Sequence, residues 1–263
     1  MFRIRESLAE LWHYRELFWF LAWRDVKVRY KQAVLGAGWA LIQPLCAMVI
    51  LTVFFGKLPG IVSHDMPYPL FTYCALVPWT YFSGTLSQAG NSLVANSNLI
   101  TKVYFPRVLL PASSALSGLL DFLVGSAFLI VLMVFYRIHP SWALIFYPLL
   151  IVELWMLTLG LGMWLAALNV RYRDIKYMIP FLIQLGLLVT PVIYPKTLIP
   201  IRLQPVLALN PMAGLIEGFR ACLFPHGPID FGLIASSAAV ATFVFVASAL
   251  YFRNTERAFA DIV

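Results

Sequence analysis

Six long apolar runs are the feature of this sequence that most restricts its possible folds. A helix needs about 20 apolar residues to cross a membrane. Hydrophobic residues make up 61% of the 263-residue chain and charged residues only 12%, about half of the roughly 25% that soluble domains carry. The sequence therefore predicts an all-α integral membrane protein with six transmembrane helices, at residues 35–56, 70–90, 109–136, 142–169, 177–194 and 231–252.

Lysine and arginine are distributed unevenly between the segments that flank these runs. Seven precede the first run, two lie between the second and third, three between the fourth and fifth, and two follow the sixth. The alternate segments hold the other five of the 19. Cytoplasmic segments carry the excess of basic residues, so we expect both termini in the cytoplasm. The net charge of +7 lies mostly beside the runs, where membrane lipids rather than nucleic acid are the expected partner.

Residues 1–34 predict an amphipathic helix in the cytoplasmic membrane interface, followed by one six-span domain at residues 35–263. Charged residues gather opposite an apolar sector, although Leu17, Phe20 and Leu21 interrupt the polar face. A simple lipid anchor and a helix with a further role both stay open. The apolar sector contains Leu8, Trp12, Trp19, Val26 and Tyr30.

Two segments between the runs are longer than the about 2 to 8 residues that helix connections need. Asn91–Arg107 predicts a short cytoplasmic helix, for which a passive connector and a docking element are the alternatives. Residues 195–230 contain six prolines and an amphipathic stretch at Met212–Phe224. That stretch is too short to cross a membrane, so we expect short re-entrant or interfacial helices that form a gate on the external side.

Asp121 and Glu153 are the carboxylates that lie well inside the predicted spans. Such groups usually face the bundle interior and are often functional. Proton coupling through Asp121 is one interpretation, and a hydrogen-bonded packing role is the other. The spans contain no Lys, Arg or His as a relay partner, which favours packing.

The sequence lacks the motifs of an enzyme. It contains no HExxH, no GxSxG and no GxxxxGK[ST], so it offers no zinc-protease, hydrolase or phosphate-binding signature. His64, His139 and His226 all fall outside the runs. Three scattered cysteines form no metal cluster. We expect no cofactor or metal in this chain, and any ATP and Mg²⁺ must be bound by a partner.

Aromatic residues make up 15% of the chain and gather near the predicted external ends of the runs. Most of them are expected to anchor helices at the headgroups. Some are expected to line a passage, and the candidates are Trp79, Tyr81, Phe82 and Tyr194.

Three stretches resemble a known family: RDVKVRYKQAVLGAGWALIQP (24–44), VRYRDIKYMIPFLIQLGLLVTPVIYP (170–195) and NPMAGLIEGFRACL (210–223). KVYFPRVLLP (102–111) and ERAFADIV (256–263) fit the same pattern. They are similar to the permease subunits of polysaccharide ABC exporters, the type-2 permeases that move O-antigen or teichoic-acid chains. The resemblance covers nearly the whole chain.

The resemblance implies a homodimer in the bacterial inner membrane, with a channel for lipid-linked polysaccharide and two copies of a separate ABC ATPase. It also implies roles for residues of three segments. The coupling helix would contain Asn98, Leu99, Ile100, Lys102, Val103, Tyr104 and Arg107. The interfacial helix at the channel entrance would contain Arg24, Lys27, Arg29 and Tyr30. The external gate would contain Asn210, Pro211, Glu217, Phe219 and Arg220.

A proton-coupled secondary transporter that uses Asp121 is the alternative function. Such folds usually show internal repeats, and no convincing repeat is present here. The glycan itself is not encoded in any motif.

Overall fold

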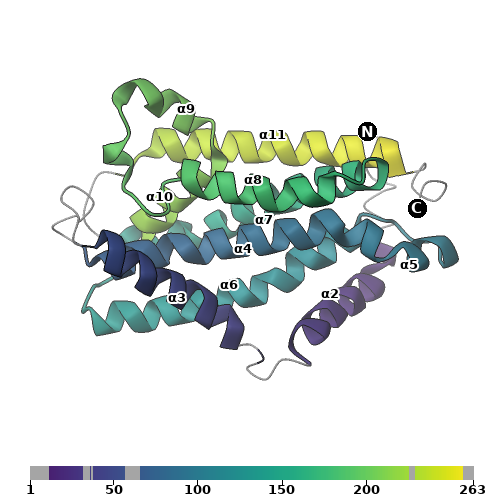
Figure 1. The fold of residues 1–263 in the computed structure, drawn as a ribbon, viewed down its shortest axis with the longest axis horizontal. Coiled ribbons are helices and arrows are strands. Elements are labelled where there is room, and N and C mark those ends of the chain that lie inside the picture. The colour runs from purple at the N-terminus through teal and green to yellow at the C-terminus, as the bar shows by residue number, and fades with distance from the viewer. Residues whose placement is uncertain (1–11, 32–35, 37, 57–65, 225–228, 257–263) are drawn as a thin grey trace.

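The computed structural model describes residues 12–31, 36, 38–56, 66–224 and 229–256. Within these ranges every regular element is a helix, and most of the long helices lie side by side along the longest dimension (Figure 1). The elements in chain order are α2 (Arg15–Tyr30), α3 (Gly38–Phe55), α4 (Tyr68–Ala95), α5 (Ser97–Lys102), α6 (Leu109–Phe135), η1 (Trp142–Phe146), α7 (Tyr147–Arg171), α8 (Ile175–Val189), η2 (Lys196–Leu198), η3 (Ile201–Leu203), α9 (Gln204–Ala208), α10 (Pro211–Leu223) and α11 (Phe231–Thr255).

Helices form in all six predicted apolar runs. In the described ranges, four are long and apolar enough to cross a membrane: α3, α6, the continuous Trp142–Arg171 segment of η1 and α7, and α11. α4 is not among the four although it has 28 residues, and α8 is apolar but has 15 residues. The all-α membrane class is therefore confirmed, while the number of six spans stays a prediction.

α4 is the central helix of the bundle, because it contacts α3, α6, α7, α8 and α10. Its position explains its polar composition. Thr72 and Ser92 are buried, and their hydroxyls donate to carbonyls one turn earlier, at distances of 2.9 Å and 2.7 Å. A helix that is surrounded by other helices can carry such hydrogen-bonded side chains, whereas a lipid-facing helix cannot expose unpaired ones.

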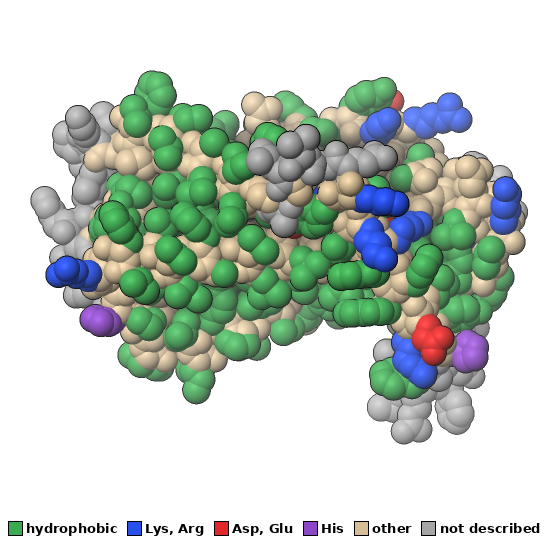
Figure 2. Space-filling view, turned by 90° about the horizontal axis from the view of Figure 1, so that it is seen from below, with side chains coloured by type: hydrophobic (Ala, Val, Ile, Leu, Met, Phe, Trp, Pro, Cys, Tyr) green, Lys and Arg blue, Asp and Glu red, His purple; other side chains and the backbone are tan. Residues whose placement is uncertain are grey.

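The two ends of the bundle differ in charge. Figure 2 shows apolar side chains over most of one face, with Lys and Arg gathered toward one end. At that end α2 begins, α5 lies and α11 terminates, while α9 and α10 lie at the opposite end (Figure 1). In the described part of the chain, the elements predicted to be cytoplasmic thus share one end, and α9 and α10, predicted to be external, share the other.

Two hydrophobic clusters fill the described part of the bundle. The larger includes Tyr73, Phe122 and Phe219, and joins α4, α6 and α10. The second lies toward the α5 end and includes Leu21 of α2 and Phe252 of α11. Since α2 contributes to this cluster and packs against α6, it forms part of the bundle.

Glycines allow the closest contacts of α11. A Cβ on Gly160 of α7 would lie 2.9 Å from the Cα of Phe245, and one on Gly214 of α10 would lie 2.4 Å from the Cβ of Ser237. Small residues at such crossings let helix backbones approach, which is the main source of packing energy between membrane helices. Gly84 of α4 differs, because a Cβ there would meet no atom within 4 Å.

We expect Gly160→Val to lower the free energy of unfolding by about 1–3 kcal/mol, because the added side chain must push α11 away from α7. The check is the thermal unfolding midpoint of purified protein, followed by tryptophan fluorescence. Gly84→Ala is the matched control and should leave the midpoint unchanged. Equal midpoints for Gly160→Val and the wild type would show that this contact is not tight.

Candidate functional site

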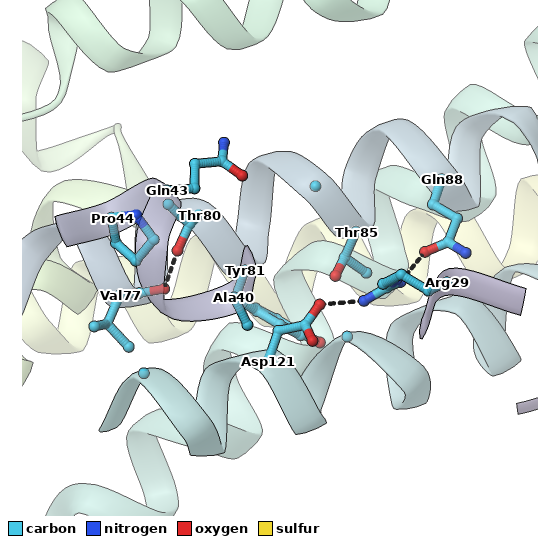
Figure 3. A pocket seen from close by; sticks show the side chains of 13 residues that line it. Arg29, Ala40, Gln43, Pro44, Val77, Thr80, Tyr81, Thr85, Gln88 and Asp121 are labelled. Atoms are coloured by element: carbon cyan, nitrogen blue, oxygen red, sulfur yellow. Dashed lines mark hydrogen bonds and ion pairs between the residues drawn. The ribbon is translucent and has the colours of Figure 1, made fainter. Parts of the chain in front are cut away.

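A polar pocket lies where the last turn of α2, the start of α3 and the middle parts of α4 and α6 meet (Figure 3). Its volume is about 240 Å³. Three glycines and a few small apolar residues share its wall with polar side chains. The polar residues are Arg29, Gln43, Thr80, Tyr81, Thr85, Gln88 and Asp121.

Arg29 connects three helices at this pocket. One guanidinium nitrogen donates to the Asp121 carboxylate on α6, and another donates to Oε1 of Gln88 on α4. The hydroxyl of Tyr30 donates to the second carboxylate oxygen of Asp121. Both side chains of the ion pair are 28% exposed, so the pair is mostly shielded from solvent. The predicted entrance residues Arg29 and Tyr30 therefore hold α2 to α6.

The predicted spans contain no basic partner for Asp121, but the structure supplies one from outside them. Arg29 lies 92 positions earlier in the sequence and outside every apolar run, so no local pattern indicates the contact. α2 packs against α6, which brings its last turn to the level of Asp121, about three helical turns from the start of α6.

Gln43, Thr80, Thr85 and Gln88 are pocket residues that the sequence analysis did not select. The sequence of α4 does contain a pattern that indicates them, because small or polar residues occupy every fourth position at Thr80, Gly84 and Gln88. Residues at this spacing lie on one face of a helix. A polar face on a membrane helix predicts a protein-lined or water-lined surface.

The other predicted entrance residues, Arg24 and Lys27, contact side chains of α2 itself. Arg24 pairs with Asp25 at 2.9 Å, and Asp25 accepts a hydrogen bond of 3.2 Å from the Ser113 hydroxyl on α6. The Lys27 ammonium lies 5.8 Å from the centroid of the Trp23 ring, within reach of a cation–π contact. A role of these residues at a channel entrance stays a prediction.

The predicted apolar sector of α2 is exposed at its start and meets the bundle at its end, where Tyr30 bonds to α6. Trp12 and Trp19 are 71% and 66% exposed, whereas Leu21 is only 1% exposed and packs in the second cluster. Leu21, which the sequence pattern places on the polar face, is thus the packing contact. α2 carries apolar residues on two sides because one side meets the protein and the other is left for lipid. Leu8 lies outside the described residues.

The predicted coupling segment forms α5 and the extended residues after it. Val103 and Tyr104 are 50% and 80% exposed at the charged end of the bundle, and Asn98 and Lys102 are also exposed. Ile100 is buried in the second cluster, with Leu99 half-buried against it. Ile100 therefore belongs to the core of the subunit, and Val103 with Tyr104 supplies the apolar surface that remains available.

Arg107 is engaged within the subunit. Its backbone N–H donates to Oε1 of Glu256 at 2.6 Å, and its guanidinium donates to the Glu256 carbonyl. These bonds join the segment after α5 to the end of α11. Arg107 thus positions this segment. The remainder of the C-terminal motif, residues 257–263, lies outside the described residues.

Arg220 fixes α10 to the chain that follows α8. Its side chain donates to the carbonyls of Pro191 and Val192 at 2.8 Å and 3.1 Å, pairs with Glu217 at 2.8 Å, and lies 3.6 Å from the centroid of the Phe71 ring. α8 ends at Val189, so the carbonyls beyond it have no helical donor. Arg220 supplies these donors while it is only 5% exposed.

The start of α10 is also determined by its sequence. Oδ1 of Asn210 accepts from the Met212 N–H at 3.1 Å, its Nδ2 donates to the Thr190 hydroxyl at 3.0 Å, and Pro211 takes the first helical position, where its missing N–H has no cost. Phe219 is buried against Phe122. The predicted short helix is confirmed as an element, and its action as an external gate stays a prediction.

Three of the four proposed channel aromatics are core residues. Trp79, Tyr81 and Phe82 are each less than 10% exposed, and the Tyr81 hydroxyl donates to the Ala115 carbonyl at 3.0 Å. Tyr81 also forms part of the wall of the polar pocket, and a channel-lining role of the three aromatics stays a prediction. Tyr194 is partly exposed, and for it the interpretation stays a prediction.

Glu153 of α7 lies at the contact with α10 and α11. Its Oε1 is 2.6 Å from the hydroxyl of Ser237, which is also 2.5 Å from the Pro211 carbonyl. This network supports the packing interpretation of Glu153. Among the described residues, no group of three or more His, Cys, Asp or Glu side chains could hold a metal ion.

A helical membrane bundle with a polar pocket between its helices and a charged end is compatible with the membrane subunit of a transporter. The chain is a member of the ABC-2 type transporter membrane family, whose sequence model matches residues 16–224.

Individual relatives are similar over almost their whole length. An O-antigen export system permease protein RfbA from Myxococcus xanthus is 30% identical over 97% of this chain and 98% of its own length. A protein of the same name from Klebsiella pneumoniae is 28% identical over 91% of this chain and 92% of its own. The polysialic acid transport protein KpsM from Escherichia coli is 25% identical over 89% and 92%.

We expect Arg29 and Asp121 to be energetically coupled. Arg29→Met and Asp121→Leu should each lower stability, because each leaves a shielded charge without its partner, and the double variant should lose less than the sum. The coupling should be on the order of 1 kcal/mol, below that of a fully buried pair. Thermal unfolding of the four proteins measures it, and additive losses would contradict a direct pair.

The stabilisation by the ion pair between Lys196 and Asp230 should depend on pH. Lys196 donates to Asp230 at 2.8 Å, and this bond, together with the Leu233 N–H, lowers the pKa of Asp230 below its ordinary value of 3.8. The stabilisation is therefore present above pH 3.8 and lost as the pH falls through the lowered pKa. Asp230→Asn keeps the helix cap but cannot titrate. Between pH 7 and pH 3 the wild-type unfolding temperature should fall more than that of this variant, and parallel curves would refute the link.

Proposed function

We propose that the chain is the channel-forming permease subunit of an ATP-driven exporter, which moves lipid-linked polysaccharide from the cytoplasm across the bacterial inner membrane. The observation that carries this proposal is the end-to-end similarity to the O-antigen permease of Myxococcus xanthus. Relatives with two different named cargoes, O-antigen and polysialic acid, share polysaccharide as the transported class. The cargo of this chain is accordingly a polysaccharide.

The proposed subunit has six spans. They are the four helices that are long and apolar enough to cross a membrane, together with α4 and α8. α4 crosses inside the bundle, where its polar side chains meet protein, and the chain beyond α8 extends its short apolar helix. Fourteen of the 19 basic residues belong to the sequence segments predicted to be cytoplasmic, so the α2 and α5 side faces the cytoplasm and both termini lie there.

The proposed partners are a second copy of this chain and two copies of an ABC ATPase that binds ATP and Mg²⁺. The ATPase docks at the charged end, where Val103 and Tyr104 are exposed beside Asn98 and Lys102. An exposed aromatic with an adjacent aliphatic side chain suits a groove in the partner. Arg107, bonded to Glu256, passes the motion of this surface to α11.

The direct test is deletion of this chain from its host. Lipid-linked polysaccharide should then accumulate on the cytoplasmic side, where a glycan-specific antibody reaches it only after permeabilisation. The wild-type chain together with the ATPase should restore surface glycan, and an ATPase that cannot hydrolyse ATP should not. Normal surface glycan in the deleted strain would overturn the proposal.

Val103→Ala combined with Tyr104→Ala should lower export and the affinity for the ATPase by about tenfold or more, since truncation of a central aromatic anchor typically costs at least about 1–2 kcal/mol. The measurements are surface glycan and co-purification of the ATPase. Trp142→Ala with Ile145→Ala is the matched control, because these residues are 70% and 76% exposed and belong to η1, not the coupling segment. Full export and unchanged ATPase affinity in the first variant would exclude docking at this surface.

A proton-coupled transporter that uses Asp121 is the second candidate. The carboxylate of Asp121 is occupied by Arg29 and Tyr30, which favours a structural role. Asp121→Asn retains a hydrogen-bonding side chain of similar volume, so export should remain above about half of the wild-type rate. A tenfold change in rate requires about 1.4 kcal/mol of activation free energy, and we expect the loss of the charge at Asp121 to cost less than this. Abolished export with normal protein levels would instead support proton coupling.

A further inference from the structure

Part of the polar pocket wall makes no hydrogen bond to the residues that the structure describes. Among the described residues, neither the amide of Gln43 nor the hydroxyl of Thr85 makes a hydrogen bond, and Gln88 uses only its oxygen, to accept from Arg29. Figure 3 shows these side chains along the pocket on α3 and α4. The amide of Gln43, the amide nitrogen of Gln88 and the hydroxyl of Thr85 can therefore form hydrogen bonds with a ligand in the pocket.

Hydrocarbon is a poor occupant of such a pocket. An amide or hydroxyl without a hydrogen bond costs several kcal/mol in a lipid environment, at roughly 2–7 kcal/mol per group. Gln43 is exposed and lies in the second turn of α3, which is one of the four membrane-crossing helices. The pocket therefore opens to water or to a polar ligand, and this side of α3 and α4 borders an aqueous path rather than lipid.

We propose that this pocket binds one sugar residue of the polysaccharide as the chain passes through the transporter, an inference that rests on the proposed function. Its volume of about 240 Å³ corresponds to about eight water molecules at roughly 30 Å³ each, which is enough for a single hexose ring. Gly84 in the wall leaves the backbone of α4 open to a ring, since a Cβ there would meet no atom within 4 Å.

The charges of the pocket favour a neutral, hydroxyl-rich ligand. Arg29 and Asp121 are the charged residues of the described lining, and they neutralise one another. A phosphate would meet the Asp121 carboxylate, and an acyl chain would leave the amides and hydroxyls unpaired. Sugar hydroxyls both donate and accept, so they match the free amides of Gln43 and Gln88 and the hydroxyl of Thr85.

The pocket can be blocked at one position without disturbing the backbone. Gly84→Leu would project into open space, since a Cβ on Gly84 meets no atom within 4 Å, and would occupy the pocket. Gly84→Ala is the matched control and leaves most of the volume free. Thr85→Val removes one hydroxyl at nearly constant shape. Unfolding midpoints equal to that of the control ensure that only the pocket has changed.

The experiment measures saturation-transfer NMR from the protein to free sugars, in copolymer nanodiscs that contain no sugar detergent. The probes are D-galactose, D-mannose and N-acetyl-D-glucosamine, with inorganic phosphate as the anionic alternative. We expect transfer to at least one sugar, at least fivefold lower in Gly84→Leu, lower in Thr85→Val and unchanged in Gly84→Ala.

Two results would overturn the proposal: no transfer to any sugar in the wild type, or equal transfer in Gly84→Leu. Broadening of the phosphate signal, lost in Arg29→Met, would assign the pocket to anions instead. Measuring export in the host distinguishes a failure of the pocket proposal from a failure of the proposed function. If the wild type exports glycan and Gly84→Leu both exports and binds sugar equally well, the pocket proposal fails while the export function stands.

Discussion

The polar groups inside this helical membrane bundle have to find partners, because lipid offers none. Arg29 is the residue where this constraint is most visible. Its guanidinium joins Asp121 of α6 and Gln88 of α4, so three separate parts of the chain meet at one cation. This contact holds the last turn of α2 against α4 and α6 and forms part of the wall of the polar pocket. Without it, two charges would lie at membrane depth unpaired.

Two further sets of hydrogen bonds connect separate helices, one set at each end of the bundle. At the charged end, Arg107 bonds to Glu256 and ties the segment after α5 to α11. At the other end, Arg220 holds α10 to the carbonyls that follow α8. The segment after α5 is therefore bonded to the end of α11, and the segment after α8 is bonded to α10. Such connected, well-packed elements transmit motion as rigid units rather than deforming continuously.

The fold was largely predictable from the sequence, because long apolar runs and basic flanks are local patterns. The pocket was not, since Arg29 and Asp121 meet across 92 positions and Arg29 looks like one more basic residue of an interfacial helix. The residue through which α2 packs on the bundle was not predicted, for a related reason. Leu21 breaks the amphipathic pattern, yet it is the residue that packs against the protein. Trp79, Tyr81 and Phe82 likewise fit either a membrane belt or a core, and only packing distinguishes these.

The central claim is that the Gln43, Gly84 and Gln88 side of the subunit faces water within the membrane. The most direct measurement is cysteine labelling by a membrane-impermeant methanethiosulfonate, in inside-out vesicles and with Cys46, Cys74 and Cys222 replaced by alanine. Leu123→Cys is the comparison, because Leu123 lies close to the depth of Asp121 on α6 and is 54% exposed. We expect Gly84→Cys to be labelled and Leu123→Cys to stay unlabelled. Protection of Gly84→Cys, with or without labelling of Leu123→Cys, would contradict it.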